Sequence, residues 1–208
     1  MPERGVIVAT DPHRETRIDL LRHGEPVGGG RYRGQVDDAL SEKGWEQMWA
    51  AVGDTADWQQ IVTSPLLRCC EFADSLGERH RLPVHREPRF REVGFGEWEG
   101  KTRAELEQIT PGQVARFYQD PVNNRPAGAE PLEAFGARVQ SGFVELVERF
   151  AGQSVLVVAH AGVIRAIMAH ALDIPLASMY RIHVANAGIS RIRTDRDRRF
   201  NLIFHGND

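Results

Sequence analysis

The tetrapeptide Arg22-His23-Gly24-Glu25 sets an imidazole and a guanidinium side by side, directly behind the apolar run Ile18–Leu21. Such a run is typical of a buried parallel strand, and a histidine at its C-terminal end projects into the crevice at that edge of the sheet. The arginine adds a permanent charge and a planar fork of donors that suits phosphate. The tetrapeptide therefore indicates a nucleophilic histidine beside a phosphate clamp.

Three further segments predict parts of the same site. Residues 61–68 predict a strand followed by a helix, with Ser64 as its cap, Pro65 at the first helical position and Arg68 in the opening turn. Such a helix start offers free N–H groups to an anion. The apolar run 155–159 ends in His160, which repeats the arrangement at His23. The glycine-rich acidic segment 90–100 can deliver a carboxylate from another direction.

These motifs, taken in order, resemble the histidine phosphatase superfamily, which contains the phosphoglycerate mutases. The resemblance runs from about Arg17 to about Phe204 and includes Ser-Pro-x-x-Arg, Glu-x-x-x-Gly-x-x-Glu-Gly and His-Ala-Gly. Residues 68–73 are similar to the α-ribazole 5′-phosphate phosphatase branch, in which many relatives have Thr where this chain has Phe72. The resemblance implies a three-layer α/β/α fold with a mostly parallel sheet, and a phosphatase that forms a phosphohistidine.

The residue types support the same chemistry. A neutral imidazole attacks phosphorus well, so His23 is the expected nucleophile, and covalent catalysis splits one difficult displacement into two easier ones. Arg22, Arg68 and His160 are expected to offset the charge on the phosphoryl oxygens, which removes the need for a metal or another cofactor. Alignment with the family places the acid that protonates the leaving group at Glu92 rather than Glu97 or Glu99.

The chain departs from the family pattern after the first motif. Many relatives have Thr and then Asn near the phosphate, whereas this chain has Pro26-Val27-Gly28-Gly29-Gly30. We expect backbone N–H groups of Gly29 and Gly30 to replace the amide, with Arg31, Arg33 and Arg125 reaching a ribose or ring atoms of the substrate. A flexible surface loop is the alternative. Relatives build their lid from the equivalent of residues 117–131, where Phe117 and Tyr118 could stack on a base.

The substrate is left open by these motifs. We expect a small-molecule phosphomonoester, and α-ribazole 5′-phosphate of cobalamin nucleotide-loop assembly is the first candidate. A broad-specificity phosphatase for sugar phosphates or small acids such as phosphoglycolate is the alternative. A mutase is less favoured because the insertions that enclose the mutase intermediate are missing, and a phosphate-binding module without catalysis is opposed by His23 and Glu92.

Alternating strand and helix patterns predict one domain over residues 17–208, preceded by a loose tail over residues 1–16. Short helices are expected within 102–118, broken at Pro111-Gly112, and a loop over 120–131. The predicted strands are 18–21, 61–63, 84–86, 155–159, 181–184, 189–194 and 201–205, and the longer predicted helices are 41–55, 66–80, 132–150 and 163–172.

Composition limits the other function classes. With 208 residues, 41% apolar and 26% charged, the chain can bury a full core, and its net charge of −3 gives no reason to expect nucleic acid or an anionic membrane as a partner. No apolar run could span a membrane, and Val6–Thr10 is too short for a signal-peptide core, so we expect a cytoplasmic protein. The adjacent Cys69 and Cys70 are expected to be buried helix residues. A homodimer is compatible with the sequence.

Overall fold

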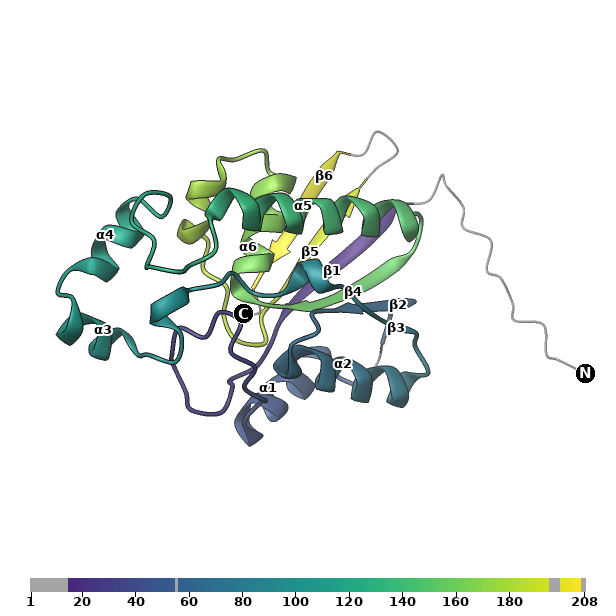
Figure 1. Cartoon of the computed structure of the whole chain (residues 1–208). Coiled ribbons are helices and arrows are strands. Elements are labelled where there is room, and N and C mark those ends of the chain that lie inside the picture. Colours follow the sequence, from purple (N-terminus) through teal and green to yellow (C-terminus); the bar gives the residue numbers. More distant parts are fainter. Residues whose placement is uncertain (1–14, 55, 195–198, 207–208) are drawn as a thin grey trace, which may run out of the picture.

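The computed structural model describes residues 15–54, 56–194 and 199–206, and these form one six-stranded sheet (Figure 1). The strand order is β3-β2-β4-β1-β5-β6, in which the first four strands run parallel, β5 pairs antiparallel with β1, and β6 pairs antiparallel with β5. The mostly parallel sheet that the sequence predicts is therefore confirmed. The strands are β1 (Thr16–Arg22), β2 (Gln60–Thr63), β3 (Val84–Arg86), β4 (Ser154–Ala159), β5 (Ile189–Thr194) and β6 (Phe200–His205).

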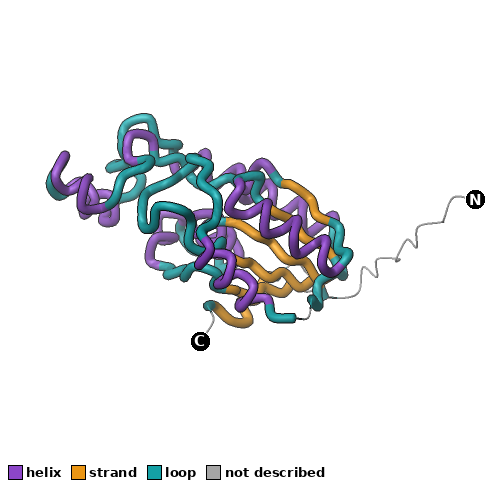
Figure 2. The backbone as a smooth tube through the Cα atoms, turned by 90° about the horizontal axis from the view of Figure 1, so that it is seen from below, coloured by secondary structure: helices purple, strands orange, loops and turns teal. Residues whose placement is uncertain are grey.

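Helices cover both faces of this sheet. Alternate residues of β1 and β4 point to opposite sides, so Ile18, Leu20 and Val157 pack with α5 and α6, whereas Leu21 and Leu156 pack with α1 and α2. Figure 1 shows these two helix pairs on either side of the sheet, and Figure 2 shows the strands from below as one layer. The four helices are α1 (Glu42–Val52), α2 (Leu67–His80), α5 (Leu132–Arg149) and α6 (Ala161–Ala171).

A smaller helical region lies beyond one end of the sheet. Its helices α3 (Arg103–Ile109) and α4 (Gln113–Gln119) are separated at Pro111-Gly112, as the sequence predicts, and enclose a separate apolar cluster around Trp98 and Phe117. The Thr102 hydroxyl accepts from the Glu105 amide, and the Glu105 carboxylate accepts in return, so α3 begins with a capping box.

Two glycines allow the segment after β1 to cross the start of α1. A Cβ on Gly24 would lie 2.2 Å from the Gly44 carbonyl oxygen, and a Cβ on Gly44 would lie 2.1 Å from that of Glu25. The N-cap Ser41 also donates from its hydroxyl to the Glu25 carbonyl, at 2.9 Å. Because no side chain other than hydrogen fits at this crossing, the backbone that follows His23 is held against α1.

Two local predictions are wrong. Helix α2 begins at Leu67, so Ser64 does not cap it and Pro65 is not its first residue. The Ser64 hydroxyl instead contacts the Leu66 amide and the His160 ring, so it connects two parts of the candidate site. Residues 181–184 form no strand, because the carbonyls of Ile182 and Val184 accept from arginine side chains rather than from a neighbouring strand.

The remaining differences concern element ends. Thr16 already belongs to β1, so the predicted tail is too long by that residue, and residues 1–14 lie outside the described part of the chain, as does Thr55 at the predicted end of the first helix. The loop expected over 120–131 contains no helix or strand. Cys69 and Cys70 are buried and unpaired, as predicted. No helix among the described residues is long and apolar enough to cross a membrane.

Candidate active site

The pairing of β1 with β4 brings the two strand-end histidines together. The strands run parallel with Arg22 opposite Ala159, so His23 and His160 leave the sheet at the same edge. Their ring centroids lie 5.2 Å apart, with an angle of 63° between the ring planes. Two motifs that are separated by more than half the chain therefore contribute to one site, as the strand-end positions predict.

The tautomer of His23 is defined by its backbone contact. Its Nδ1 lies 2.7 Å from the Gly24 carbonyl oxygen, which can only accept, so Nδ1 carries the proton and Nε2 keeps a lone pair in the neutral ring. Burial lowers the pKa of His23 well below its ordinary value, and the charges of Arg22 and Arg68 lower it further. The free protein thus holds His23 as a neutral imidazole with Nε2 available for attack.

Arg22 and Arg68 are held by backbone carbonyls rather than by carboxylates. Arg22 donates to the Val184 carbonyl at 2.6 Å, and Arg68 donates to the Val36 and Gly34 carbonyls at 2.7 and 2.8 Å. The buried Nε of each arginine has no hydrogen-bond partner among the described residues. Burial lowers the pKa of Arg22 to about 10, which leaves it charged at neutral pH. Buried donors without acceptors, on two charged groups, suit an anion with several oxygens.

His160 lies behind His23 and is fully buried. Its Nε2 is 2.7 Å from the Ser64 hydroxyl oxygen, and the Cys69 sulfur lies 3.7 Å from the same nitrogen. Burial lowers the pKa of His160 well below its ordinary value, and the Arg68 and His23 charges act in the same direction. His160 is not among the residues that line the cavity, and its contact with phosphate stays a prediction.

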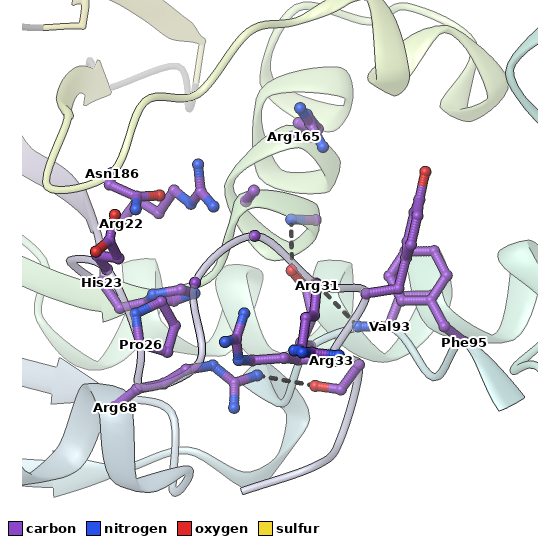
Figure 3. A pocket seen from close by; sticks show the side chains of 18 of the residues that line it. Arg22, His23, Pro26, Arg31, Arg33, Arg68, Val93, Phe95, Arg165 and Asn186 are labelled. Atoms are coloured by element: carbon purple, nitrogen blue, oxygen red, sulfur yellow. Dashed lines mark hydrogen bonds between the residues drawn. The ribbon is translucent and has the colours of Figure 1, made fainter. Parts of the chain in front are cut away.

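Glu92 faces the site across the cavity, and its carboxylate is fixed by two backbone amides. Oε1 accepts from Val93 at 2.9 Å, and Oε2 accepts from Gly162 at 3.0 Å (Figure 3). The side chain of Arg138 donates to the backbone carbonyl of Glu92 and forms an ion pair with Glu130 at 2.7 Å. Glu130 therefore helps to hold the segment that carries Glu92.

The other two acids of this segment turn elsewhere. The Glu99 carboxylate accepts from the Phe95 and Gln35 amides and so closes the loop, while Glu97 is exposed. Neither residue lines the cavity, whereas Glu92 does. Of the three acids in this segment, Glu92 is the one that lines the cavity, and its role as the acid stays a prediction.

The cavity has a volume of about 260 Å³ and a strongly cationic wall. Gly29, Gly30 and Arg31 line it as expected, and Tyr118, with 47% of its surface exposed, borders the opening. Phe117 does not border it, because its ring is fully buried against Trp98 and Tyr180. The expectation that Phe117 stacks on a substrate is therefore wrong.

Arg125 does not line the cavity either. It donates to the Gly94 carbonyl at 3.2 Å and lies over the Phe117 ring. The Gly29 amide is occupied as well, because it donates to the Pro26 carbonyl at 3.2 Å. Of the backbone groups expected to replace a side-chain amide, the one on Gly29 is thus already used within the loop.

Several cavity residues were not predicted from the sequence, namely Tyr180, Asn186 and Arg165. Arg165 follows Gly162 by three residues on α6, so the helical spacing from the His-Ala-Gly motif could have identified it. Tyr180 lies in the short η3 (Leu176–Arg181) and Asn186 in the irregular segment after it, where no periodic pattern signals their position. Among the described residues, no group of three or more His, Cys, Asp or Glu is placed to hold a metal ion.

The comparisons with known proteins agree with this geometry. Residues 18–207 match the histidine phosphatase superfamily (branch 1), and the chain belongs to that family. A bifunctional protein of Mycobacterium tuberculosis is 34% identical over 180 residues, which cover 84% of this chain but 49% of that protein. The chain thus spans about half the length of this relative.

Two further relatives carry names that specify substrates. Glucosyl-3-phosphoglycerate phosphatase of Mycobacterium tuberculosis is 35% identical over 177 residues, which cover 79% of each chain. The solved native structure of a mycobacterial glucosyl-3-phosphoglycerate phosphatase has a TM-score of 0.82 at 30% identity and covers 94% of this chain and all of that one. Adenosylcobalamin/alpha-ribazole phosphatase of Salmonella typhimurium is 30% identical over 173 residues, covering 81% of this chain and 85% of the relative. An α-ribazole phosphatase is thus among the relatives, and the glucosyl-3-phosphoglycerate phosphatase has the higher sequence identity of the two.

Proposed function

We propose that this chain is a phosphomonoesterase that forms a phosphohistidine on Nε2 of His23. The observation that carries the proposal is the pairing of a neutral histidine, whose Nδ1 proton is held by Gly24, with two arginines whose buried Nε donors lack acceptors. A lone pair on Nε2 supplies the nucleophile, and the guanidinium groups supply the charge that a phosphoryl group requires during transfer.

The reaction proceeds in two displacements. Nε2 attacks phosphorus, the ester P–O bond breaks, and Glu92 in its protonated form gives the leaving oxygen a proton. Glu92, now a carboxylate, takes a proton from water, whose oxygen attacks the phosphohistidine and releases phosphate and free His23. Arg22 and Arg68 offset the charge on the equatorial oxygens in both steps.

His160 acts from behind the nucleophile in this proposal. It packs edge-on against His23 and lies in the field of Arg68. A bound phosphate dianion favours the protonated form of a nearby imidazole, so His160 adds positive charge when the site is occupied. Ser64 holds its ring during that change.

The substrate proposal keeps two candidates. α-Ribazole 5′-phosphate is supported by the aromatic side chains that line the cavity, Tyr32, Phe95, Tyr118 and Tyr180, because rings offer a surface for a bulky nucleoside-like group. A phosphorylated sugar acid is supported by Arg165, which lines the same cavity and forms no ion pair with any carboxylate in the described part of the chain. A guanidinium beyond the phosphate suits a substrate carboxylate, and a relative is named for glucosyl-3-phosphoglycerate.

The decisive experiment is rapid-quench trapping with radiolabelled p-nitrophenyl phosphate. We expect an acid-labile phosphoenzyme in the wild type and none in His23→Ala, whose circular dichroism should match the wild type. Turnover of His23→Ala near the wild-type rate would exclude the mechanism.

A substrate panel then separates the candidates. It contains α-ribazole 5′-phosphate, glucosyl-3-phosphoglycerate and phosphoglycolate, compared by kcat/KM. Transfer of the phosphoryl group to a second substrate molecule instead of water would indicate a mutase. Phosphate binding without turnover of any ester would indicate a binding module.

A further inference from the structure

Arg33 is a third arginine beside the nucleophile, and the mechanism above does not use it. Its side chain is 7% exposed and lines the cavity. Nε donates to Asp38 at 2.9 Å, and Nη2 donates to the Val27 carbonyl at 2.6 Å. These two contacts fix the guanidinium plane, while Nη1 has no hydrogen-bond partner within the described residues.

The side chain of Arg33 points toward the reacting centre. Figure 3 shows it entering the pocket beside Arg68 and extending toward His23. Its charge contributes to the lowered pKa of His23, and the charge of Arg68 in turn helps to lower the pKa of Arg33. Two buried like charges that face one histidine are unfavourable in the empty protein, and an anion between them relieves that repulsion.

Three consecutive glycines precede Arg31 and Arg33 and bring no side chains of their own to the cavity. They are Gly28, Gly29 and Gly30, and a Cβ on Gly29 or Gly30 would meet nothing within 4 Å. The other cavity-lining arginine of this segment, Arg31, donates to the Gly28 and Gly100 carbonyls and is 37% exposed. Arg33 is the more buried of the two cations.

We propose that Arg33 is a third phosphate-binding guanidinium, which donates from Nη1 to an equatorial oxygen of the phosphoryl group. The proposal rests on the proposed function in that the pocket must bind phosphate. Its role is catalytic as well as binding, because a rigid donor aimed at the phosphoryl group stabilises the charge that develops during transfer. The Val27 carbonyl and Asp38 each accept from this guanidinium, so its direction does not depend on Asp38 alone.

The alternative is that Arg33 only fastens its own loop through Val27 and Asp38. A fastening role predicts similar losses on removing either end of the Arg33–Asp38 pair, accompanied by a lower melting temperature. A phosphate contact predicts a much larger effect from removing the guanidinium, and a larger effect on a transition-state mimic than on phosphate itself.

The test compares Arg33→Met with Asp38→Asn by calorimetric titration with inorganic phosphate and with orthovanadate. We expect Arg33→Met to weaken vanadate binding about ten- to a hundredfold, as for a charge-assisted hydrogen bond, and to weaken phosphate binding less. We expect Asp38→Asn to stay within about threefold of the wild type because Val27 still holds the guanidinium. Arg33→Met within threefold of the wild type, or equal losses in both variants with equal falls in melting temperature, would overturn the proposal.

A measurement on the wild-type protein covers the case in which Arg33→Met does not fold. The guanidinium NMR signals of Arg33, assigned with Arg33→Lys, should shift and exchange more slowly with solvent on saturation with inorganic phosphate. Signals unchanged at saturation would overturn the proposal, as would a wild type that binds no phosphate. If phosphate binds through Arg33 but no phosphohistidine forms, the proposed reaction fails and this inference stands.

Discussion

Replacing Gly162 with alanine should displace the proposed acid without changing any ionisable group. A Cβ at this position would lie 2.2 Å from Oε1 of Glu92, whereas ordinary contact begins at about 3.4 Å. The carboxylate must therefore move by about 1.2 Å, the difference between those distances, and it loses the 3.0 Å hydrogen bond from the Gly162 amide. A misplacement of about 1 Å can cost about a hundredfold in rate, or about 2.7 kcal/mol.

The stability of Gly162→Ala should change little. Alanine in the first turn of α6 favours the helix by about 1 kcal/mol relative to glycine, and this offsets the loss of one hydrogen bond of about the same size. The melting temperature thus separates a displaced carboxylate from a damaged fold.

The assay compares kcat/KM for an alkyl phosphate, such as glycerol 2-phosphate, with that for p-nitrophenyl phosphate. We expect about a hundredfold loss on the alkyl ester and a much smaller loss on the nitrophenyl ester, because nitrophenolate leaves with little help from an acid.

A double-variant cycle tests whether the effect passes through Glu92. In the Glu92→Ala background no carboxylate remains to be displaced, so adding Gly162→Ala should be nearly neutral. An equal hundredfold loss in both backgrounds, or an equal loss on both esters, would refute the assignment of Glu92 as the acid.

Three further predictions concern charge, pH and specificity. Activity should survive exhaustive chelation, because Arg22 and Arg68 supply the positive charge that offsets the negative charge of the phosphate. A loss of activity that Mg²⁺ or Zn²⁺ restores would contradict this prediction. The unfolded chain binds protons below about pH 6.5 that the native state excludes from His23, so the free energy of unfolding should fall with decreasing pH by up to about 1.36 kcal/mol per unit for this histidine. Urea midpoints at pH 7.5 and 5.5 check it, and an equal drop in His23→Asn would argue against it. Tyr118→Ala should lower kcat/KM for α-ribazole 5′-phosphate more than for phosphoglycolate, while Phe117→Ala should instead destabilise the fold by about 3–5 kcal/mol.

The sequence predicts the parts of the site that lie at the ends of regular elements. His23 and His160 end two apolar runs, and parallel strands present their C-terminal ends at one edge, so their proximity follows from local patterns alone. The same holds for the two short helices divided at Pro111-Gly112, where proline and glycine mark the boundary. The sheet and its covering helices follow from the alternation of such patterns.

The predictions fail where a residue forms its hydrogen bond with a partner far away in the sequence. Ser64 precedes a helix and resembles a cap, yet its hydroxyl lies against His160, 96 residues away. Residues 181–184 have strand-like composition, yet their carbonyls accept from Arg22 and Arg165. Each local pattern is outweighed by a contact that exists only once the sheet has formed, and no single-sequence periodicity contains that information.

The motifs predict the roles of Arg22 and Arg68, but they do not predict which groups hold the two side chains in place. A salt bridge involves an acidic partner, which can be looked for in the sequence. Arg22 and Arg68 are instead held by backbone carbonyls, which every residue has. Carbonyl anchors also leave the positive charge uncompensated, which a carboxylate partner would not. The carbonyl contacts that the sequence does not predict are thus the ones that prepare the pocket for an anion.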